Sequence, residues 1–342
     1  MLYPLAQQAL KFALAAGTVP FLKGEPGIGK TDMVNQAAEE LGRPVVEETL
    51  ATMEAIDLRG LPNTDHATRT VWWAKPDFIE KLERASAHGT KRPVLFIDEA
   101  NAVGQALQVP MMQLTLRGVV GPHKLPDGTS IVLAGNRIKD RAAAQRSPTA
   151  LNNRVLHLPV EVCLKTWLKW AAGAQLHPAL VAFQMLRGEG QVGKPGLLHQ
   201  FDPTKPDQEA FCSPRSWANT HPWIDAPDEI RVGGIEGLVG NNGATELEGF
   251  LRVYRSLEPL PRIIANPDTA KVPKDSSTQF AVCLALSRAA NGANLQNIMK
   301  YIARIGKEFE VMTLTDTVRR HPDLANTTAY IHWQAANADI MI

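Results

Sequence analysis

Apolar residues follow two alternating periods along the first 160 residues. Spacings of three and four residues predict amphipathic helices, at residues 2–16, 33–41, 78–87 and 102–116. Short apolar runs between them are typical of strands buried on both faces of a parallel sheet, at residues 19–22, 45–46, 93–97, 131–134 and 155–158. Strands that alternate with helices form right-handed βαβ units. We therefore expect an α/β domain whose parallel sheet is flanked by helices.

Two segments interrupt this alternation. Residues 57–73 contain Gly60, Pro62 and Asn63, which break any helix and predict an insertion or hairpin. Residues 117–128 end in Asp-Gly and carry the glycines of a β-hairpin. Proline removes a helical hydrogen bond, so Pro110 should kink or divide the helix at 102–116.

Strand signals fade after residue 158, and the remaining chain is expected to be helical. Helical spacing occurs at 167–185 and 244–257, with a Gly- and Pro-rich stretch between them. After a linker rich in Pro and Asn, one apolar stripe runs through 295–309 and is typical of helix packing. We predict three domains: a P-loop core (1–158), a small helical lid (159–257) and a helical C-terminal extension (258–342).

The chemical signal in the N-terminal part is a glycine-rich loop between a strand and a helix. Residues 24–31 have the form G-x-x-x-x-G-K-[ST], which predicts a phosphate-binding loop. Glycines let backbone N–H groups approach an anion, and the following helix N-terminus favours phosphate. Lys30 would reach the β and γ phosphates, and the Thr31 hydroxyl would hold Mg²⁺. The predicted nucleotide-binding residues are Gly24, Glu25, Pro26, Gly27, Ile28, Gly29, Lys30, Thr31 and Asp32.

A second acidic motif follows the apolar run at 93–97. Asp98 would bind Mg²⁺, directly or through water, and Glu99 would orient and polarise the attacking water. Asp98 could instead only cap a helix. The phosphate loop about 70 residues earlier makes the metal-binding interpretation the stronger one. Since ligands bind at the carboxyl ends of parallel strands, Thr31, Asp98, Glu99 and Asn136 are expected to converge.

Composition narrows the class of protein only slightly. The net charge of +1 implies no general attraction to nucleic acid or membrane surfaces. The three cysteines, Cys163, Cys212 and Cys283, are far apart, which argues against a disulfide framework or a zinc knuckle. No apolar run has transmembrane length, and the N-terminus lacks the basic start of a signal peptide. A cytoplasmic protein is the expectation.

Several motifs together resemble the AAA+ ATPases, and within them the MoxR branch with its NorQ-like and CbbQ-like proteins. The matching segments are GEPGIGKT, VLFIDEAN, LAGNR and SPRSW, together with the two insertions at 58–62 and 117–128. The resemblance covers roughly residues 1–255. It implies an ATP hydrolase that uses ATP and Mg²⁺.

The resemblance also assigns further site residues. Asn136 matches sensor 1, which places the water near the γ phosphate, and Arg215 matches sensor 2. Arg154 matches the arginine finger, which acts on nucleotide bound to the neighbouring subunit. Arg141 and Arg146 are rivals for that role. Each of these arginines could equally form an ordinary surface or interface ion pair.

A finger supplied by a neighbour requires a homo-oligomer. The resemblance implies a ring, most often a hexamer, and nothing in the sequence excludes a spiral or a filament. It further implies remodelling or activation of a protein client, often beside a von Willebrand A-type protein. The alternative is an AAA+ motor or loader acting on nucleic acid, which the low net charge disfavours. The insertions would contact the client through Arg59, Leu61, His123 or Lys124, or be plain hairpin surface.

Overall fold

The computed structural model describes residues 1–87, 92–140, 149–190, 195–205 and 207–337. Its contacts divide the chain into two compact units. Unit 1 comprises Met1–Thr166, Phe201–Gln208 and Ser213–Arg215. Unit 2 comprises Trp167–Gln200, Glu209–Cys212 and Ser216–Ile342. The two units are described separately.

Unit 1 is built on a five-stranded sheet in the order β2-β5-β8-β1-β9. Every neighbouring pair in this sheet is parallel, which confirms the predicted fold class. Its strands are β1 (Pro20–Lys23), β2 (Val45–Thr49), β5 (Val94–Asp98), β8 (Ser130–Gly135) and β9 (Leu156–Pro159). The five apolar runs of the sequence therefore correspond to the five strands.

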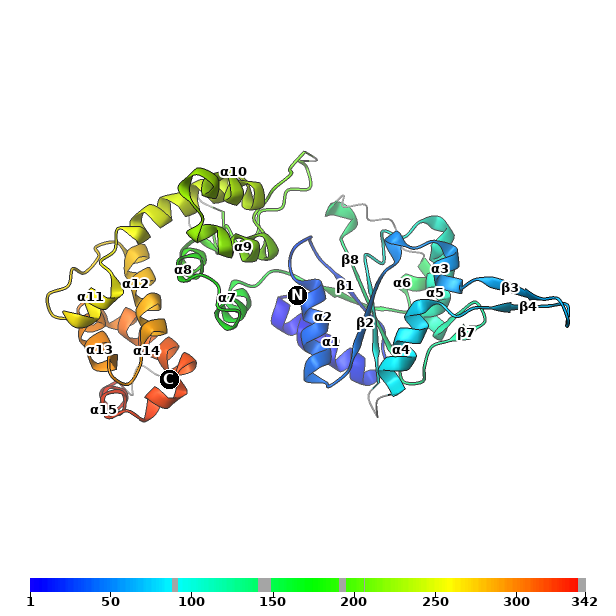
Figure 1. Cartoon of the computed structure of the whole chain (residues 1–342), viewed down its shortest axis with the longest axis horizontal. Helices are drawn as coiled ribbons and strands as arrows, with labels where there is room; N and C mark the ends of the chain where they lie inside the picture. Colours follow the sequence, from blue (N-terminus) through cyan, green and yellow to red (C-terminus); the bar gives the residue numbers. More distant parts are fainter. Residues whose placement is uncertain (88–91, 141–148, 191–194, 206, 338–342) are drawn as a thin grey trace. The chain divides into compact units, whose positions relative to one another are not determined.

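Helices cover both faces of the sheet (Figure 1). Successive strand residues point to opposite faces, so Val94 and Phe96 of β5 pack with the α1 and α2 cluster. Leu95 and Ile97 pack into the cluster on the other face, which the remaining helices of the unit supply. The helices of the unit, on both faces, are α1 (Tyr3–Ala16), α2 (Lys30–Glu40), α3 (Ala55–Arg59), α4 (Asp77–Ala87), α5 (Gln105–Arg117) and α6 (Thr149–Asn152), with the 3₁₀ turns η1 (Leu50–Thr52) and η2 (Ile138–Asp140).

Both predicted insertions form two-stranded antiparallel ribbons. β3 (Pro62–Asp65) pairs with β4 (Thr70–Trp73), and Figure 1 shows this ribbon projecting away from the sheet. β6 (Val119–Val120) pairs with β7 (His123–Lys124). The hairpin predictions are confirmed.

The sequence predicts that Pro110 kinks or divides its helix; the division does not occur, and the kink stays a prediction. α5 (Gln105–Arg117) runs through Pro110 as one element. Tertiary packing outweighs the lost hydrogen bond, since Leu107, Met111 and Leu114 on the inner face are all buried in the core.

Unit 2 is helical throughout its described part. It contains α8 (Pro178–Arg187), α10 (Asp228–Arg255), α11 (Leu260–Ala265), α12 (Ser276–Ala289), α13 (Leu295–Ala303), α14 (Lys307–Arg320) and α15 (Thr328–Ala336), with the 3₁₀ turns η3 (His221–Asp225) and η4 (Pro322–Asn326). α7 (Leu164–Gly173) and α9 (Pro214–Thr220) each include residues assigned to both units. α12 packs against α8, α10 and α14, so residues after 258 share a unit with the preceding helices. The predicted boundaries at 158 and 257 stay predictions.

Each of two long stretches with helical spacing in the sequence forms two helices rather than one. The pattern at 167–185 forms α7 and α8, and the stripe at 295–309 spans α13 and the start of α14. The second break falls at Gly306, whose φ of 149° is a conformation that glycine adopts without steric strain. No helix among the described residues is both long and apolar enough to span a bilayer.

Candidate nucleotide site

The phosphate loop joins the end of β1 to the first turn of α2. Gly27 and Gly29 have φ values of 75° and 87°, in the left-handed region that side chains disfavour. A Cβ on Gly27 would also lie 2.7 Å from Ser213 Oγ. The loop therefore requires glycine both for its conformation and for its packing. Since α2 begins at Lys30, its free N–H groups lie at the loop, as an anion site requires.

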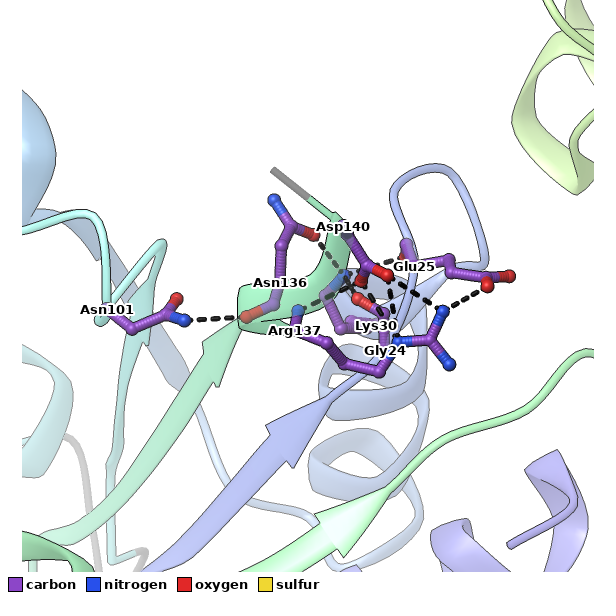
Figure 2. Close-up of polar contacts among 7 residues, drawn as sticks. All are labelled: Gly24, Glu25, Lys30, Asn101, Asn136, Arg137 and Asp140. Carbon is purple, nitrogen blue, oxygen red and sulfur yellow. Dashed lines mark hydrogen bonds and ion pairs between the residues drawn. The ribbon is translucent and has the colours of Figure 1, made fainter. Parts of the chain in front are cut away.

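Lys30 is held inside the loop by three oxygen atoms. Its Nζ donates to the carbonyl oxygens of Gly24 and Glu25 and to Asn136 Oδ1, each at 3.0 Å (Figure 2). Burial lowers the pKa of Lys30 to about 8, with Asp98 opposing the shift and Arg215 adding to it. The structure thus brings the predicted loop lysine and the predicted sensor residue together.

The side chains of Thr31, in the first turn of α2, and Asp98, at the end of β5, contact each other. Thr31 Oγ1 donates to Asp98 Oδ2 at 3.3 Å. A hydroxyl and a carboxylate oxygen this close suit Mg²⁺, which takes few protein oxygens and keeps several waters. The pair predicted as metal ligands therefore fits the ion in both chemistry and position.

Glu99 follows Asp98 in an unusual backbone conformation. Its φ is 51°, a region that non-glycine residues adopt rarely and mainly at functional sites. Asp98 Oδ1 accepts the Glu99 N–H at 2.8 Å, which stabilises this turn. The Glu99 side chain is exposed, as a group that must reach a water molecule requires.

Asn101 was not among the predicted site residues, yet it fixes the position of Asn136. Its Nδ2 donates to the Asn136 carbonyl oxygen at 2.6 Å (Figure 2), and its side chain is buried. A Cβ at Gly135 would lie 2.0 Å from Asn101 Oδ1, so only glycine leaves room for this contact. The sequence signal was an asparagine two residues after Glu99.

Arg137 also went unpredicted. Its guanidinium donates to both carboxylate oxygens of Asp140 and to Glu25 in the phosphate loop (Figure 2). Burial disfavours its charge, but the bonds to Asp140 and Glu25 raise the pKa of Arg137 overall. The Asp140 side chain is only 1% exposed. Arg137 therefore links the end of β8 to the loop through two carboxylates.

Two further contacts hold the loop from outside. The Arg215 backbone N–H donates to the Gly27 carbonyl oxygen at 3.1 Å, while the Arg215 side chain is exposed. The Tyr3 hydroxyl donates to the Gly29 carbonyl oxygen at 3.3 Å, and burial raises the pKa of Tyr3. The assignment of Arg215 as a sensor stays a prediction. No sequence signal pointed to Tyr3.

The remaining predicted site residues are either exposed at the surface or not among the residues that the structure describes. Arg154 follows α6 with its side chain exposed, and it makes no ion pair with any residue that the structure describes. Asp32 lies in the first turn of α2 and is also exposed. Arg141 and Arg146, the two rivals for the finger, lie outside the described residues.

The parallel sheet and the glycine-rich loop define a P-loop nucleotide-binding protein. Residues 20–156 match the family described as "ATPase family associated with various cellular activities (AAA)". This segment is an AAA ATPase domain, and the match indicates ATP hydrolysis. It contains the phosphate loop, Asp98, Glu99 and Asn136.

One curated relative and several solved structures resemble parts of the chain. Lon protease 2 of Thermus thermophilus is 35% identical over 94 residues, which are 27% of this chain and 11% of that protein. The chain thus matches about a tenth of that relative's length. RuvB of Thermotoga maritima, described as a Holliday junction branch migration motor, is 16% identical over 89% of this chain and 86% of its own, with a TM-score of 0.38. NtrX from Brucella abortus, in complex with ADP, is 14% identical over 94% and 67%, with a TM-score of 0.41.

The first prediction separates binding from hydrolysis. Glu99→Gln should bind ATP as the unsubstituted protein does but hydrolyse it about a hundredfold more slowly or worse, because the water loses its proton acceptor. Lys30→Ala should lose nucleotide binding, since the phosphate charge loses its partner. Fluorescent-nucleotide titration and phosphate release measure the two steps. Lys165→Ala, an exposed lysine of the same unit, is the control. Unchanged turnover in Glu99→Gln would remove Glu99 from the mechanism.

The second prediction concerns Arg137. Arg137→Gln leaves the buried Asp140 carboxylate without its cation, which should lower the free energy of unfolding by about 2–3 kcal/mol. The double variant Arg137→Gln, Asp140→Asn removes the stranded charge and should recover most of that loss. Denaturant titration of both variants gives the comparison. A double variant as unstable as the single one would show that the ion pair is not the cause.

Proposed function

We propose that this protein hydrolyses ATP at the residue 24–31 loop and uses the energy to remodel or activate a protein partner, as MoxR-like ATPases do. The observation that carries the hydrolysis step is the meeting of Lys30 with Asn136, beside the Thr31 and Asp98 pair. Lys30 and the N–H groups of α2 bind the phosphates. Thr31 and Asp98 hold Mg²⁺, which neutralises charge that develops on the phosphate oxygens.

Glu99 orients the attacking water, and Asn136 helps to place it. Asn101 positions Asn136 through its carbonyl oxygen. Arg137, which also pairs with Asp140, offsets part of the charge of Glu25 and so reduces the repulsion between this loop carboxylate and the nucleotide. Arg215 adds positive charge near Lys30.

Assembly into a homo-oligomer completes the proposed site. Arg154 is exposed and makes no ion pair within the described part of the chain, so its guanidinium is available to a neighbouring subunit. An arginine supplied in this way stabilises the charge of the transition state. A closed ring, most often of six subunits, is the proposed arrangement, in the cytoplasm.

The surface of the β3–β4 ribbon favours a protein, rather than a nucleic acid, as the partner. Its Val71 and Trp72 and the adjacent Leu61 are each more than half exposed, on an element that projects from the domain (Figure 1). Exposed apolar groups that gather on one element are typical of protein-binding surfaces. Nucleic acid would instead favour a basic surface. A von Willebrand A-type protein is the proposed class of partner, from the resemblance to the MoxR branch.

The third prediction tests shared active sites. Specific ATPase activity should rise with protein concentration, and Arg154→Ala should hydrolyse ATP about a thousandfold more slowly. Mixed with the unsubstituted protein in varying ratio, it should lower activity more steeply than dilution does. Arg84→Ala, a surface arginine on α4, is the matched control. Activity that is flat with concentration and simply additive in mixtures would mean that each subunit works alone.

The fourth prediction distinguishes a protein remodeller from a nucleic-acid motor. Adding double-stranded DNA, single-stranded DNA or RNA should leave the rate of ATP hydrolysis unchanged, because the ribbon exposes the apolar side chains of Val71 and Trp72 and Arg69 is its one exposed arginine. The rate is measured at two salt concentrations. Stimulation that weakens steeply as salt increases would favour the nucleic-acid motor instead.

A further inference from the structure

Unit 2 contains a basic cleft that the nucleotide site does not use. Its volume is about 660 Å³, within the range of about 300–1,000 Å³ typical of small-molecule sites. The cleft lies where α7, α12 and α14 end. The lining residues are Lys169, Ala172, Gly173, Gln175, Arg288, Arg319, Arg320 and His321.

Positive charge in this cleft exceeds the negative charge that compensates it. Arg319 and Arg320 share one carboxylate, Asp316. Arg288 and Lys169 make no ion pair with any described residue. Burial lowers the pKa of Arg288, and the nearby charge of Arg320 lowers it further. The cationic groups therefore repel one another, and an anion between them would relieve that repulsion.

Two buried nitrogen atoms of residues that line the cleft lack a hydrogen-bond partner among the described residues. Arg288 Nη1 donates to the Leu176 carbonyl oxygen at 2.8 Å, but its Nη2 is buried and unbonded. His321 Nε2 is buried and unbonded as well. Buried polar groups nearly always have partners, so each such group requires an explanation. Arg288 and His321 therefore keep hydrogen-bonding capacity that the described part of the fold does not use.

Helix dipoles explain only part of this cluster. Basic side chains in the last turn of a helix interact favourably with its carboxyl end, and Arg288, Arg319 and Arg320 occupy such positions. That role does not require Arg288 Nη2 and His321 Nε2 to be buried without hydrogen-bond partners among the described residues. Nor does it account for Lys169, which lines the cleft but lies outside the last turn of α7.

We propose that this cleft binds a small phosphate-rich anion. Arginine guanidinium groups match phosphate oxygens in paired hydrogen bonds. Among the described residues, the lining includes no Phe, Tyr or Trp on which a base could stack, unlike sites for single-stranded nucleic acid. The ligand is therefore recognised by its phosphates. This proposal does not depend on the proposed remodelling function.

The fifth prediction uses inorganic pyrophosphate as the probe. The full chain carrying Lys30→Ala, which disables the phosphate loop, should still bind pyrophosphate at one site by calorimetry. Adding Arg288→Gln should weaken this binding about tenfold or more, because a charge-assisted hydrogen bond is lost. Lys169→Glu should weaken it too, and this exposed residue can be changed without disturbing the core.

The matched control is Arg252→Gln with Lys300→Gln in the same Lys30→Ala background. Both residues are exposed basic residues of unit 2 outside the cleft, and the pair removes as much positive charge as either test variant or more. Pyrophosphate affinity should stay unchanged in this control. Absence of binding in Lys30→Ala, or binding unaffected by both cleft substitutions, would overturn the proposal. Tighter binding of single-stranded DNA, lost in the same cleft variants, would reassign the cleft to nucleic acid.

Discussion

The parallel register between β1 and β8 is the constraint on which the nucleotide site depends. Lys23 of β1 pairs with Gly135 of β8, so both strands end at the same level of the sheet. The residues that follow, Gly24 and Asn136, therefore begin side by side. That register brings Lys30 within 3.0 Å of an amide oxygen 106 positions away in the sequence. A one-residue shift in the register would turn the β8 side chains to the other face.

The polar groups around the loop form one connected network. Lys30 is bonded by loop carbonyl oxygens and by Asn136, and Asn101 and Arg137 hold the segment that carries Asn136. Phosphate oxygens that enter the loop would be stronger acceptors for the Lys30 amine than these carbonyls. Nucleotide binding would thus alter the bonding of Asn136 directly. Arg137 also joins Glu25 of the loop to Asp140 of η2.

The net charge of this chain is small, but charged side chains are concentrated at particular sites. The net charge of +1 does not reveal that Arg137 forms ion pairs with two carboxylates beside the loop. It also conceals a cleft in unit 2 where cations outnumber their partners. Salt screens electrostatic interactions beyond about 10 Å. The charges near each site therefore influence ligand binding more than the net charge of the whole chain does.

The sequence by itself determined the sheet, the flanking helices, both hairpins and the residues of the phosphate loop. These features depend on local information: apolar periodicity, glycines that permit left-handed backbone, and an acidic pair directly after a strand. Only the tertiary structure decided that α5 continues through Pro110, because core packing compensates a lost hydrogen bond. Only it placed Tyr3, Asn101 and Arg137 at the site and gathered Lys169, Arg288 and His321 in one cleft. Those contacts join residues far apart in the chain, and no spacing in the sequence encodes them.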